Sequence, residues 1–440
     1  MTLGAFLEPL VVVSLLFGGA WFNRNQDYDF WAGSQTWGNE RILKKSDGVA
    51  GRLESALMNP QGSADRDPSS SASSSSSDAG SRSSPALDPY ELIISTSRQR
   101  KIRFLGFQRL VSTPNTFVFR DRFCSRLLRK FPFLTEAWYW ALIYWVYQLG
   151  RAFTAVAIVE GTIHVARKHA LQLIHLEQRL HIFWEQPFQG WFLARPDLLH
   201  WINRTYSFIH IPGTIFFLVA LFYLTTTRHR QALTGRLNKD NVAAGPALYE
   251  SRRRTMAVCN LIAFVVFTLW PCMPPRLLSD PNYDGPDAPE AKSYGFVDTV
   301  HGSEGESSVW TTNRFCNQYA AMPSLHFGYS LLIGLTIATL PISGLRPGSW
   351  KRMLIIVAGM CYPALILTAI IATANHFILD AVAGAVVCGV AWYANDVLLN
   401  LCVVEDYFMW MLRMHKPVNY TDPETAVEPE FEYSLLFKGA

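Results

Sequence analysis

Three short segments of the chain place polar side chains beside apolar runs: MPPRL at 273–277, AAMPSLHFG at 320–328 and ANHFILD at 374–380. In the last segment His376 and Asp380 are four residues apart, so on a helix they lie on one face about a turn from each other. The carboxylate can then bind one imidazole nitrogen and leave the other basic. An imidazole held in this way is a nucleophile or a general base.

The second segment supplies two further candidates. His326 lies on a different predicted helix from His376, from which it could protonate a leaving group on the opposite side. Ser324 follows a proline and precedes an apolar run, so its hydroxyl and the free N–H groups of a helix start would form an anion site. Two histidines and an anion site can carry out phosphoryl transfer without a metal ion.

Two arginines are candidates for binding the phosphate. Arg276, in the first segment, would add a fork of donors to the anion site. Arg151, in the outer half of the first predicted core helix, is the other candidate, with a snorkelling or helix–helix role as its alternative. Taken alone, Ser324 could be only an N-cap, and His376 with Asp380 only a polar pair. Ionisable groups near membrane depth are costly, so their joint occurrence favours a catalytic site.

The elements that carry these residues are predicted to be membrane helices. The chain has 440 residues, of which 50% are hydrophobic and 17% charged, and the apolar residues come in blocks of spanning length. A net charge of +4 is too weak to indicate nucleic acid binding. The seven Cys lack CxxC pairs, which excludes the usual structural zinc patterns. We therefore expect an all-α polytopic membrane protein with no nucleic acid partner.

The blocks divide the chain into five parts. We expect an N-terminal transmembrane anchor at 1–23, a disordered Ser-rich linker at 24–88, a basic juxtamembrane segment at 89–135, a six-helix catalytic domain at 136–402 and a cytosolic tail at 403–440. The basic segment fits either a surface lying on an anionic leaflet or a solvated loop.

The six spans are predicted from hydropathy, and their orientation from charge. The connections 228–254 and 342–352 are basic and 277–313 is acidic, so the first two are predicted to be cytosolic and the third lumenal or extracellular. This topology brings all three polar segments to the outer face. The predicted spans are 136–158, 200–226, 255–272, 324–341, 353–373 and 377–402.

Two outer features leave alternatives open. Residues 164–185 predict an amphipathic helix whose polar face, including Glu177 and Glu185, is either solvated or in contact with a headgroup. The same polar face carries Arg179 and His181. Cys272 and Cys316 flank the outer loop and are either bridged or free thiols.

The motifs resemble those of a known family. PSLH at 323–326 and NHFILD at 375–380 resemble the second and third signature motifs of the type 2 phosphatidic acid phosphatase superfamily. The forms NQYAAMPSLH and ANHFxLD resemble its inositol phosphorylceramide synthase branch, the inositolphosphotransferases. The resemblance covers about 136–402 and implies a phosphatidic acid phosphatase-like bundle of six transmembrane helices.

The resemblance also implies roles for single residues. His376 matches the nucleophile that forms a phospho-histidine, Asp380 its orienting carboxylate, His326 the acid on the leaving group and Ser324 a phosphate ligand. Two departures stand out: Ile370 occupies the position of an arginine usual in the third motif, and a KxxxxxxRP first motif is absent from the sequence. The synthase branch also lacks that arginine, so the departures favour a transferase-type relative.

These patterns lead to a hypothesis of lipid phosphotransfer in sphingolipid metabolism. The enzyme would move a phospho-headgroup, phosphoinositol by the resemblance, from a glycerophospholipid to a lipid hydroxyl such as that of ceramide. Its partners would be membrane lipids, and its site would face the lumen of the Golgi or endoplasmic reticulum. A lipid phosphate phosphatase with water as acceptor and a non-catalytic lipid transporter or scaffold are the alternatives.

The reaction is predicted to be independent of cofactors and divalent metals, because no cluster of Asp, Glu, His or Cys with metal-ligand spacing accompanies the motifs. Dialysis of the purified enzyme against EDTA should leave its turnover unchanged. A requirement for added magnesium after that treatment would indicate a different mechanism.

Overall fold

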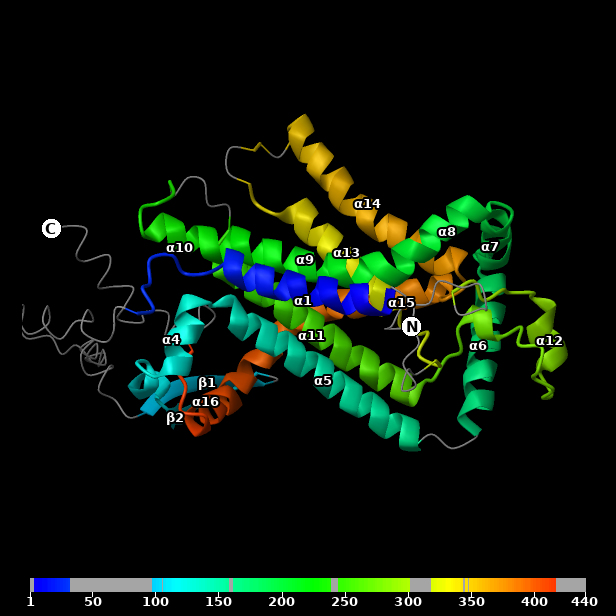
Figure 1. Cartoon of the computed structure of the whole chain (residues 1–440). Coiled ribbons are helices and arrows are strands. Elements are labelled where there is room, and N and C mark those ends of the chain that lie inside the picture. Colours follow the sequence, from blue (N-terminus) through cyan, green and yellow to red (C-terminus); the bar gives the residue numbers. More distant parts are fainter. Residues whose placement is uncertain are drawn as a thin grey trace, which may run out of the picture.

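The computed structural model of the chain describes residues 4–31, 97–104, 106–157, 161–238, 244–300, 318–342, 345–346 and 348–416. Most of the predicted Ser-rich linker, the tail from residue 417 and Cys316 lie outside these residues. The described part is mainly helical, and its long helices run alongside one another as a bundle (Figure 1).

The bundle is made of long, apolar helices. They are α1 (Gly4–Phe22), α5 (Phe133–Ala157), α9 (His210–Phe222), α11 (Pro246–Leu269), α13 (Leu325–Thr339), α14 (Trp350–Ala372) and α15 (Ile378–Ala394). Two π-helical segments, η3 (Thr205–Ile209) and η4 (Tyr223–Thr227), extend α9, and α10 (Arg228–Leu233) follows.

Smaller elements cover the two ends of the bundle (Figure 1). At one end lie α6 (Gly161–Arg179), α7 (Glu185–Leu193), α8 (Pro196–Arg204), η6 (Pro275–Leu277) and α12 (Ala288–Ser293). At the other lie β1 (Ser97–Phe104), β2 (Phe107–Pro114), η2 (Thr116–Phe119), α4 (Phe123–Lys130), η7 (Asn395–Leu401) and α16 (Cys402–Met411). The acidic connection that contains α12 and the basic α10 are thus at opposite ends, as the charge pattern predicts.

The helices long and apolar enough to cross a membrane are fewer than predicted. Among the described residues, three qualify by length and composition: His210–Leu233, Trp350–Ala372 and Ile378–Met411. The predicted count of six is therefore not confirmed. The helix α13 is apolar but has only 15 residues, and α11 carries Arg252, Arg253 and Arg254 in its first half.

The prediction of an all-α protein needs one correction, because the basic segment contains a β-hairpin. Strands β1 and β2 pair antiparallel from Ser97 opposite Pro114 to Phe104 opposite Phe107. Gly106 has a φ of 87°, which a glycine adopts without strain in the turn. The alternation that specifies the strands is obscured in the sequence because arginines occupy both faces, including the face that packs on α16.

The buried core has parts within the bundle and at the end that α6 covers. Cys272 belongs to the second part, where it packs with Ala170 and Ile174 of α6 and with Phe377. The Cys272 thiol is free and buried, as expected if Cys272 and Cys316 are not bridged. Cys316 itself lies outside the described residues.

Glycines allow α13 to approach its neighbours closely. A Cβ on Gly384 of α15 would overlap the carbonyl oxygen of Ser324, the residue at the start of α13. A Cβ on Gly334 of α13 would lie 2.7 Å from the carbonyl oxygen of Gly359 in α14. The first contact holds the start of α13, which carries Ser324 and His326, against α15, and the second holds α13 against α14.

Replacing Gly384 with alanine should separate the starts of α13 and α15. We expect Gly384→Ala to lower stability by about 1–3 kcal/mol and to reduce turnover, because the added methyl group meets backbone rather than a flexible side chain. Thermal unfolding and activity of the purified protein measure both effects.

The matched control is Gly389→Ala in the same helix, where a Cβ would meet nothing within 4 Å. There the better helix propensity of alanine should leave stability unchanged or slightly raised. Equal effects of the two substitutions would contradict the close approach of the helices.

Candidate active site

Four of the residues predicted from the motifs come together where α13 and α15 begin. His376 precedes α15 and Asp380 lies in its first turn, while Ser324 caps α13 and His326 lies in its first turn. The Nε2 atom of His376 is 3.4 Å from Nδ1 of His326. A backbone hydrogen bond of 2.9 Å from Ser324 N–H to the Asp380 carbonyl joins the two helix starts.

The backbone turn before α15 aims the imidazole of His376. The helix α14 ends at Ala372, and Ala374 has a φ of 51°. The N–H groups of Asn375 and His376 then both donate to the carbonyl of Ile370, at 3.0 and 3.2 Å. Ile370 is thus a buried residue whose carbonyl closes the turn.

The ring of His376 is held through its Nδ1 atom. Nδ1 lies 2.8 Å from the carbonyl oxygen of Ala321 and 3.5 Å from Oδ2 of Asp380. Since a carbonyl can only accept, Nδ1 must carry the proton and donate it to Ala321. The lone pair of Nε2 then remains available on the side of His326. The Ala321 carbonyl therefore holds the ring, and the orienting role of Asp380 stays a prediction.

Ser324 is fully buried and serves as an N-cap. Its Oγ accepts a hydrogen bond of 3.4 Å from the N–H of Phe327. Ser324 thus has the N-cap role that the sequence offered as the alternative. Its role as a phosphate ligand stays a prediction.

Arg276 lies against the turn that carries His376. Its backbone N–H donates to Ala374, its Nε donates to Oδ1 of Asn375 at 2.9 Å, and its Nη1 pairs with Asp298 at 2.8 Å. The guanidinium therefore positions the residue immediately before His376. Arg151 lies in α5, and its side chain is outside the described part of the structure.

Aromatic and imidazole rings that were not predicted surround His326. The ring centres of Tyr206 and His210 lie 4.9 and 5.0 Å from that of His326. Nδ1 of His210 is 3.1 Å from the hydroxyl of Tyr362. The sequence did contain a signal for these two residues. His210 follows Tyr206 by one helical turn within a mainly apolar run, and ionisable residues in such a run favour a functional site.

The prediction that the polar face of residues 164–185 is solvated is wrong for Glu177 and Glu185. Glu177 and Glu185 are fully buried beneath α15. Glu177 Oε1 accepts from the N–H of Leu379 at 2.8 Å, and Glu185 Oε1 accepts from the N–H of Ile378 at 2.7 Å. The start of a helix leaves N–H groups without partners, and these carboxylates satisfy them.

Asp380 completes this arrangement, because its Oδ2 accepts from the N–H of Phe377 at 2.9 Å. Three consecutive N–H groups at the start of α15 are therefore bound by three side-chain carboxyl groups. Burial, and next the charge of Glu185, raises the pKa of Glu177 to about 9, and burial also raises the pKa of Glu185. Glu177 and Glu185 together therefore hold a proton at neutral pH.

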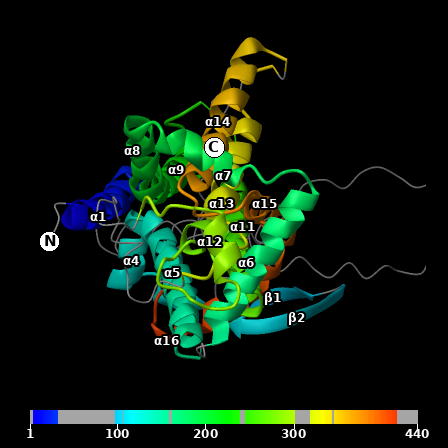
Figure 2. The same ribbon diagram turned by 90° about the vertical axis from the view of Figure 1, so that its right-hand side faces the viewer.

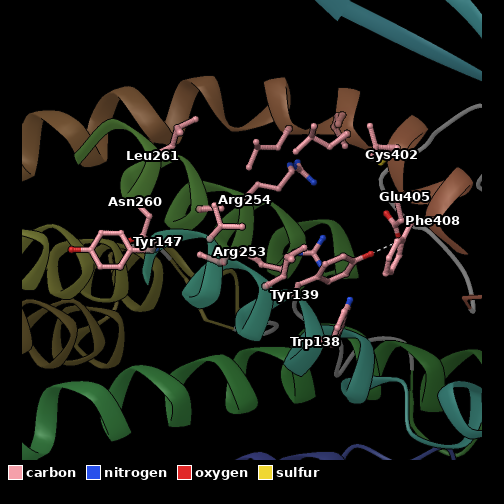
Figure 3. A pocket seen from close by; sticks show the side chains of 18 of the residues that line it. Trp138, Tyr139, Tyr147, Arg253, Arg254, Asn260, Leu261, Cys402, Glu405 and Phe408 are labelled. Carbon is pink, nitrogen blue, oxygen red and sulfur yellow. Dashed lines mark hydrogen bonds between the residues drawn. The ribbon is translucent and has the colours of Figure 1, made fainter. Parts of the chain in front are cut away.

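A separate cavity of about 660 Å³ lies between α5, α11 and the η7–α16 region (Figure 3). Its walls include Leu142, Val146, Leu261 and Phe264, and Arg253 and Glu405 lie at its edge. None of the residues around His376 lines it, so it is not part of the site described above.

Comparison with known proteins confirms the superfamily that the motifs resemble, but not the inositol phosphorylceramide synthase branch. A family model described as PAP2 superfamily matches residues 171–237 and 241–394, half of the chain. The matched region includes both helix starts and the glutamates of α6 and α7. No curated protein and no solved structure matches the sequence.

The raised pKa of Glu177 predicts how stability depends on pH. The folded protein holds this proton up to about pH 9, whereas the unfolded chain releases it above the ordinary carboxyl value of 4.5. Glu177 therefore makes the protein less stable as pH rises between these values. Glu177→Gln, which keeps an acceptor for Leu379 but cannot ionise, should flatten this dependence and raise the thermal midpoint at mildly alkaline pH.

Glu177→Ala is the contrasting variant. It leaves the N–H of Leu379 buried without a partner and should cost about 1–3 kcal/mol at every pH. Thermal unfolding in detergent at mildly acidic and mildly alkaline pH measures both. If glutamine destabilises the protein as much as alanine does at alkaline pH, the buried carboxylate is ionised and the assignment is wrong.

Proposed function

Because this chain belongs to the PAP2 superfamily, we propose that it is an integral membrane lipid phosphotransferase that works through a phospho-histidine at His376. Membership supports a lipid phosphatase or phosphotransferase, and membrane-spanning helices agree with a lipid substrate. The donor is a glycerophospholipid and the acceptor a lipid hydroxyl. The motif forms around His326 and His376 favour phosphoinositol as the headgroup and ceramide as the acceptor.

The observation that carries this proposal is the hydrogen bond from Nδ1 of His376 to the Ala321 carbonyl. It leaves Nε2 of His376 unprotonated and facing His326, which is the state a nucleophile needs. Since the facing nitrogens of His376 and His326 are 3.4 Å apart, the two rings must separate to admit the phosphorus of the donor.

The reaction then has two steps. In the first, Nε2 of His376 attacks phosphorus, the bond to the diacylglycerol oxygen breaks, and His326 gives that oxygen a proton. In the second, His326 takes the proton of the acceptor hydroxyl, whose oxygen attacks phosphorus and releases His376. The proton that left His326 in the first step returns to it in the second.

The carboxylates beneath α15 favour a phosphodiester over a phosphomonoester. A diester carries one negative charge, whereas a monoester carries about −1.5 to −2 near neutral pH. Asp380, Glu185 and Glu177 occupy the N–H groups that would otherwise bind an anion at this helix start. The burial of His376 also restricts water, which favours a lipid hydroxyl as acceptor over hydrolysis.

We propose that the site faces the lumen of the Golgi or endoplasmic reticulum. The acidic segment with α12 lies at the catalytic end and the basic segments with α10 and α4 at the other, which supports this orientation by the positive-inside rule (Figure 1).

The deciding experiment is a product profile of the purified protein supplied with labelled phosphatidylinositol and ceramide. We expect an inositol phosphoryl lipid and diacylglycerol, both lost in His376→Ala. Free inositol phosphate as the main product would instead identify a phosphatase, and transfer by His376→Ala at the rate of the unchanged protein would remove the proposed mechanism.

Substitutions of Asp380 and His326 should have different effects on activity. Asp380→Asn should retain part of the activity, because the Ala321 carbonyl still holds Nδ1 of His376. His326→Ala should lower turnover by about 10²–10⁴-fold, the usual contribution of a general acid. A donor with a more acidic leaving group should restore part of the loss in His326→Ala but none of it in His376→Ala. Equal rescue of both variants would contradict the assignment of the acid.

A further inference from the structure

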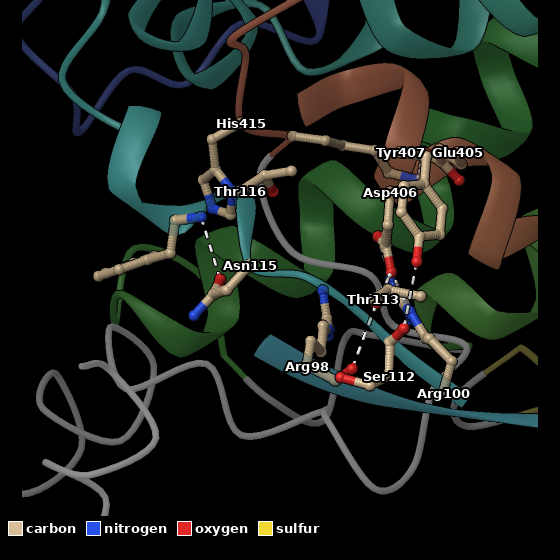
Figure 4. A network of polar contacts seen from close by, with 12 residues as sticks. Arg98, Arg100, Ser112, Thr113, Asn115, Thr116, Glu405, Asp406, Tyr407 and His415 are labelled. Carbon is tan, nitrogen blue, oxygen red and sulfur yellow. Dashed lines mark hydrogen bonds and ion pairs between the residues drawn. The ribbon is translucent and has the colours of Figure 1, made fainter. Parts of the chain in front are cut away.

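The β1–β2 hairpin is fixed rigidly to the end of the bundle opposite the catalytic site. Arg100 of β1 forms a buried two-point ion pair with Asp406 of α16, with N–O distances of 2.7 and 2.8 Å. Thr113 of β2 donates to the same carboxylate at 2.7 Å (Figure 4). Truncating one partner of such a buried pair is costly, so this contact determines where the hairpin lies.

A second contact gives the direction of the hairpin. The backbone N–H and carbonyl of Arg103 bond to the side chain of Asn400 in η7, both at 2.8 Å. From Arg100 to Arg103 the strand advances by about 10 Å. Over the same distance its partner changes from Asp406 back to Asn400, toward α15. The strand β1 therefore runs antiparallel to η7–α16, and the tip of the hairpin points toward the membrane.

The depth of the tip follows from the length of the last span. From Ile378 to Asn400 the chain rises about 25 Å in α15 and about 12 Å more in η7. With Ile378 at the outer edge of about 30 Å of hydrocarbon, Asn400 lies about 7 Å beyond the inner edge, among the headgroups. Asp396, one turn closer to α15, pairs with Arg254 at 2.9 Å, and that arginine belongs to the basic run expected at this interface.

The tip at this depth exposes apolar and basic side chains together. Phe107 is 81% exposed and Leu110 61% exposed. Arg103 and Arg109 are also exposed, and the strands project sideways beyond the helices (Figure 2). Aromatic rings and arginines are enriched at the level of lipid headgroups, where a ring and an aliphatic stem enter the bilayer and a guanidinium contacts phosphate.

We propose that the tip of the β1–β2 hairpin is a membrane anchor that inserts Phe107 and Leu110 into the leaflet opposite the catalytic site and binds anionic phospholipid there through Arg103 and Arg109. The depth of Asn400 selects a lipid surface rather than bulk solvent, and the positive charge selects anionic headgroups. The rigid pair of Arg100 with Asp406 holds the tip at this level.

Photocrosslinking tests the proposal. The full chain with benzoylphenylalanine in place of Phe107 is placed in nanodiscs of phosphatidylcholine with a minor fraction of phosphatidylserine and irradiated. We expect phospholipid adducts on residue 107, with phosphatidylserine enriched over its bulk fraction. One arginine near an anionic surface corresponds to about fivefold in lipid preference.

The matched control carries benzoylphenylalanine in place of Val118, which is 59% exposed in η2, the element that follows the base of the hairpin. It should give few lipid adducts. In a second control, Arg103→Gln with Arg109→Gln should keep the adducts at residue 107 but remove the enrichment in phosphatidylserine. Equal labelling at residues 107 and 118, adducts between two protein copies, or enrichment that survives loss of both arginines would overturn the proposal.

Discussion

The site depends on one hydrogen bond, from Nδ1 of His376 to the carbonyl oxygen of Ala321. Without it the imidazole could carry its proton on either nitrogen, and the nucleophile would be protonated part of the time. The bond forms only if the segment before α13 lies against the start of α15. The Ser324–Asp380 backbone hydrogen bond and the absent side chain of Gly384 allow that approach.

The electrostatics of the site follow from the same placement. The start of α15 attracts negative charge, and the protein binds it with its own carboxylates from α6, α7 and α15 itself. Holding one of them protonated keeps the repulsion among them low. A substrate phosphate must therefore be met mainly by His326 and by the donors around it. This arrangement explains how α6 and α7, which lie across the end of the bundle, contribute to a site formed by α13 and α15.

Much of this arrangement could be predicted from the sequence, and the reasons for the remainder are physical. The spacing of His376 and Asp380 predicted that they lie together. The charge of the connecting loops predicted that His326 and Ser324 lie at the same end of the bundle. The Ala321 carbonyl has no side-chain signal. The burial of Glu177 could not be predicted because an amphipathic pattern does not distinguish solvent from the N–H groups of another helix. The β-hairpin was missed because arginines occupy both of its faces. Of the predicted spans that do not qualify, α13 is short and α11 carries three arginines in its first half.

Nucleophilic attack by Nε2 of His376 can be tested by locating the phosphoryl group on the trapped intermediate. The enzyme is given labelled donor without acceptor, denatured at alkaline pH to preserve phospho-histidine, and digested for mass spectrometry and phosphorus NMR. We expect the label on the Nε2 atom of His376, because Nδ1 is bound to Ala321. Phosphate on Nδ1 of His376, or on a different residue, would contradict it.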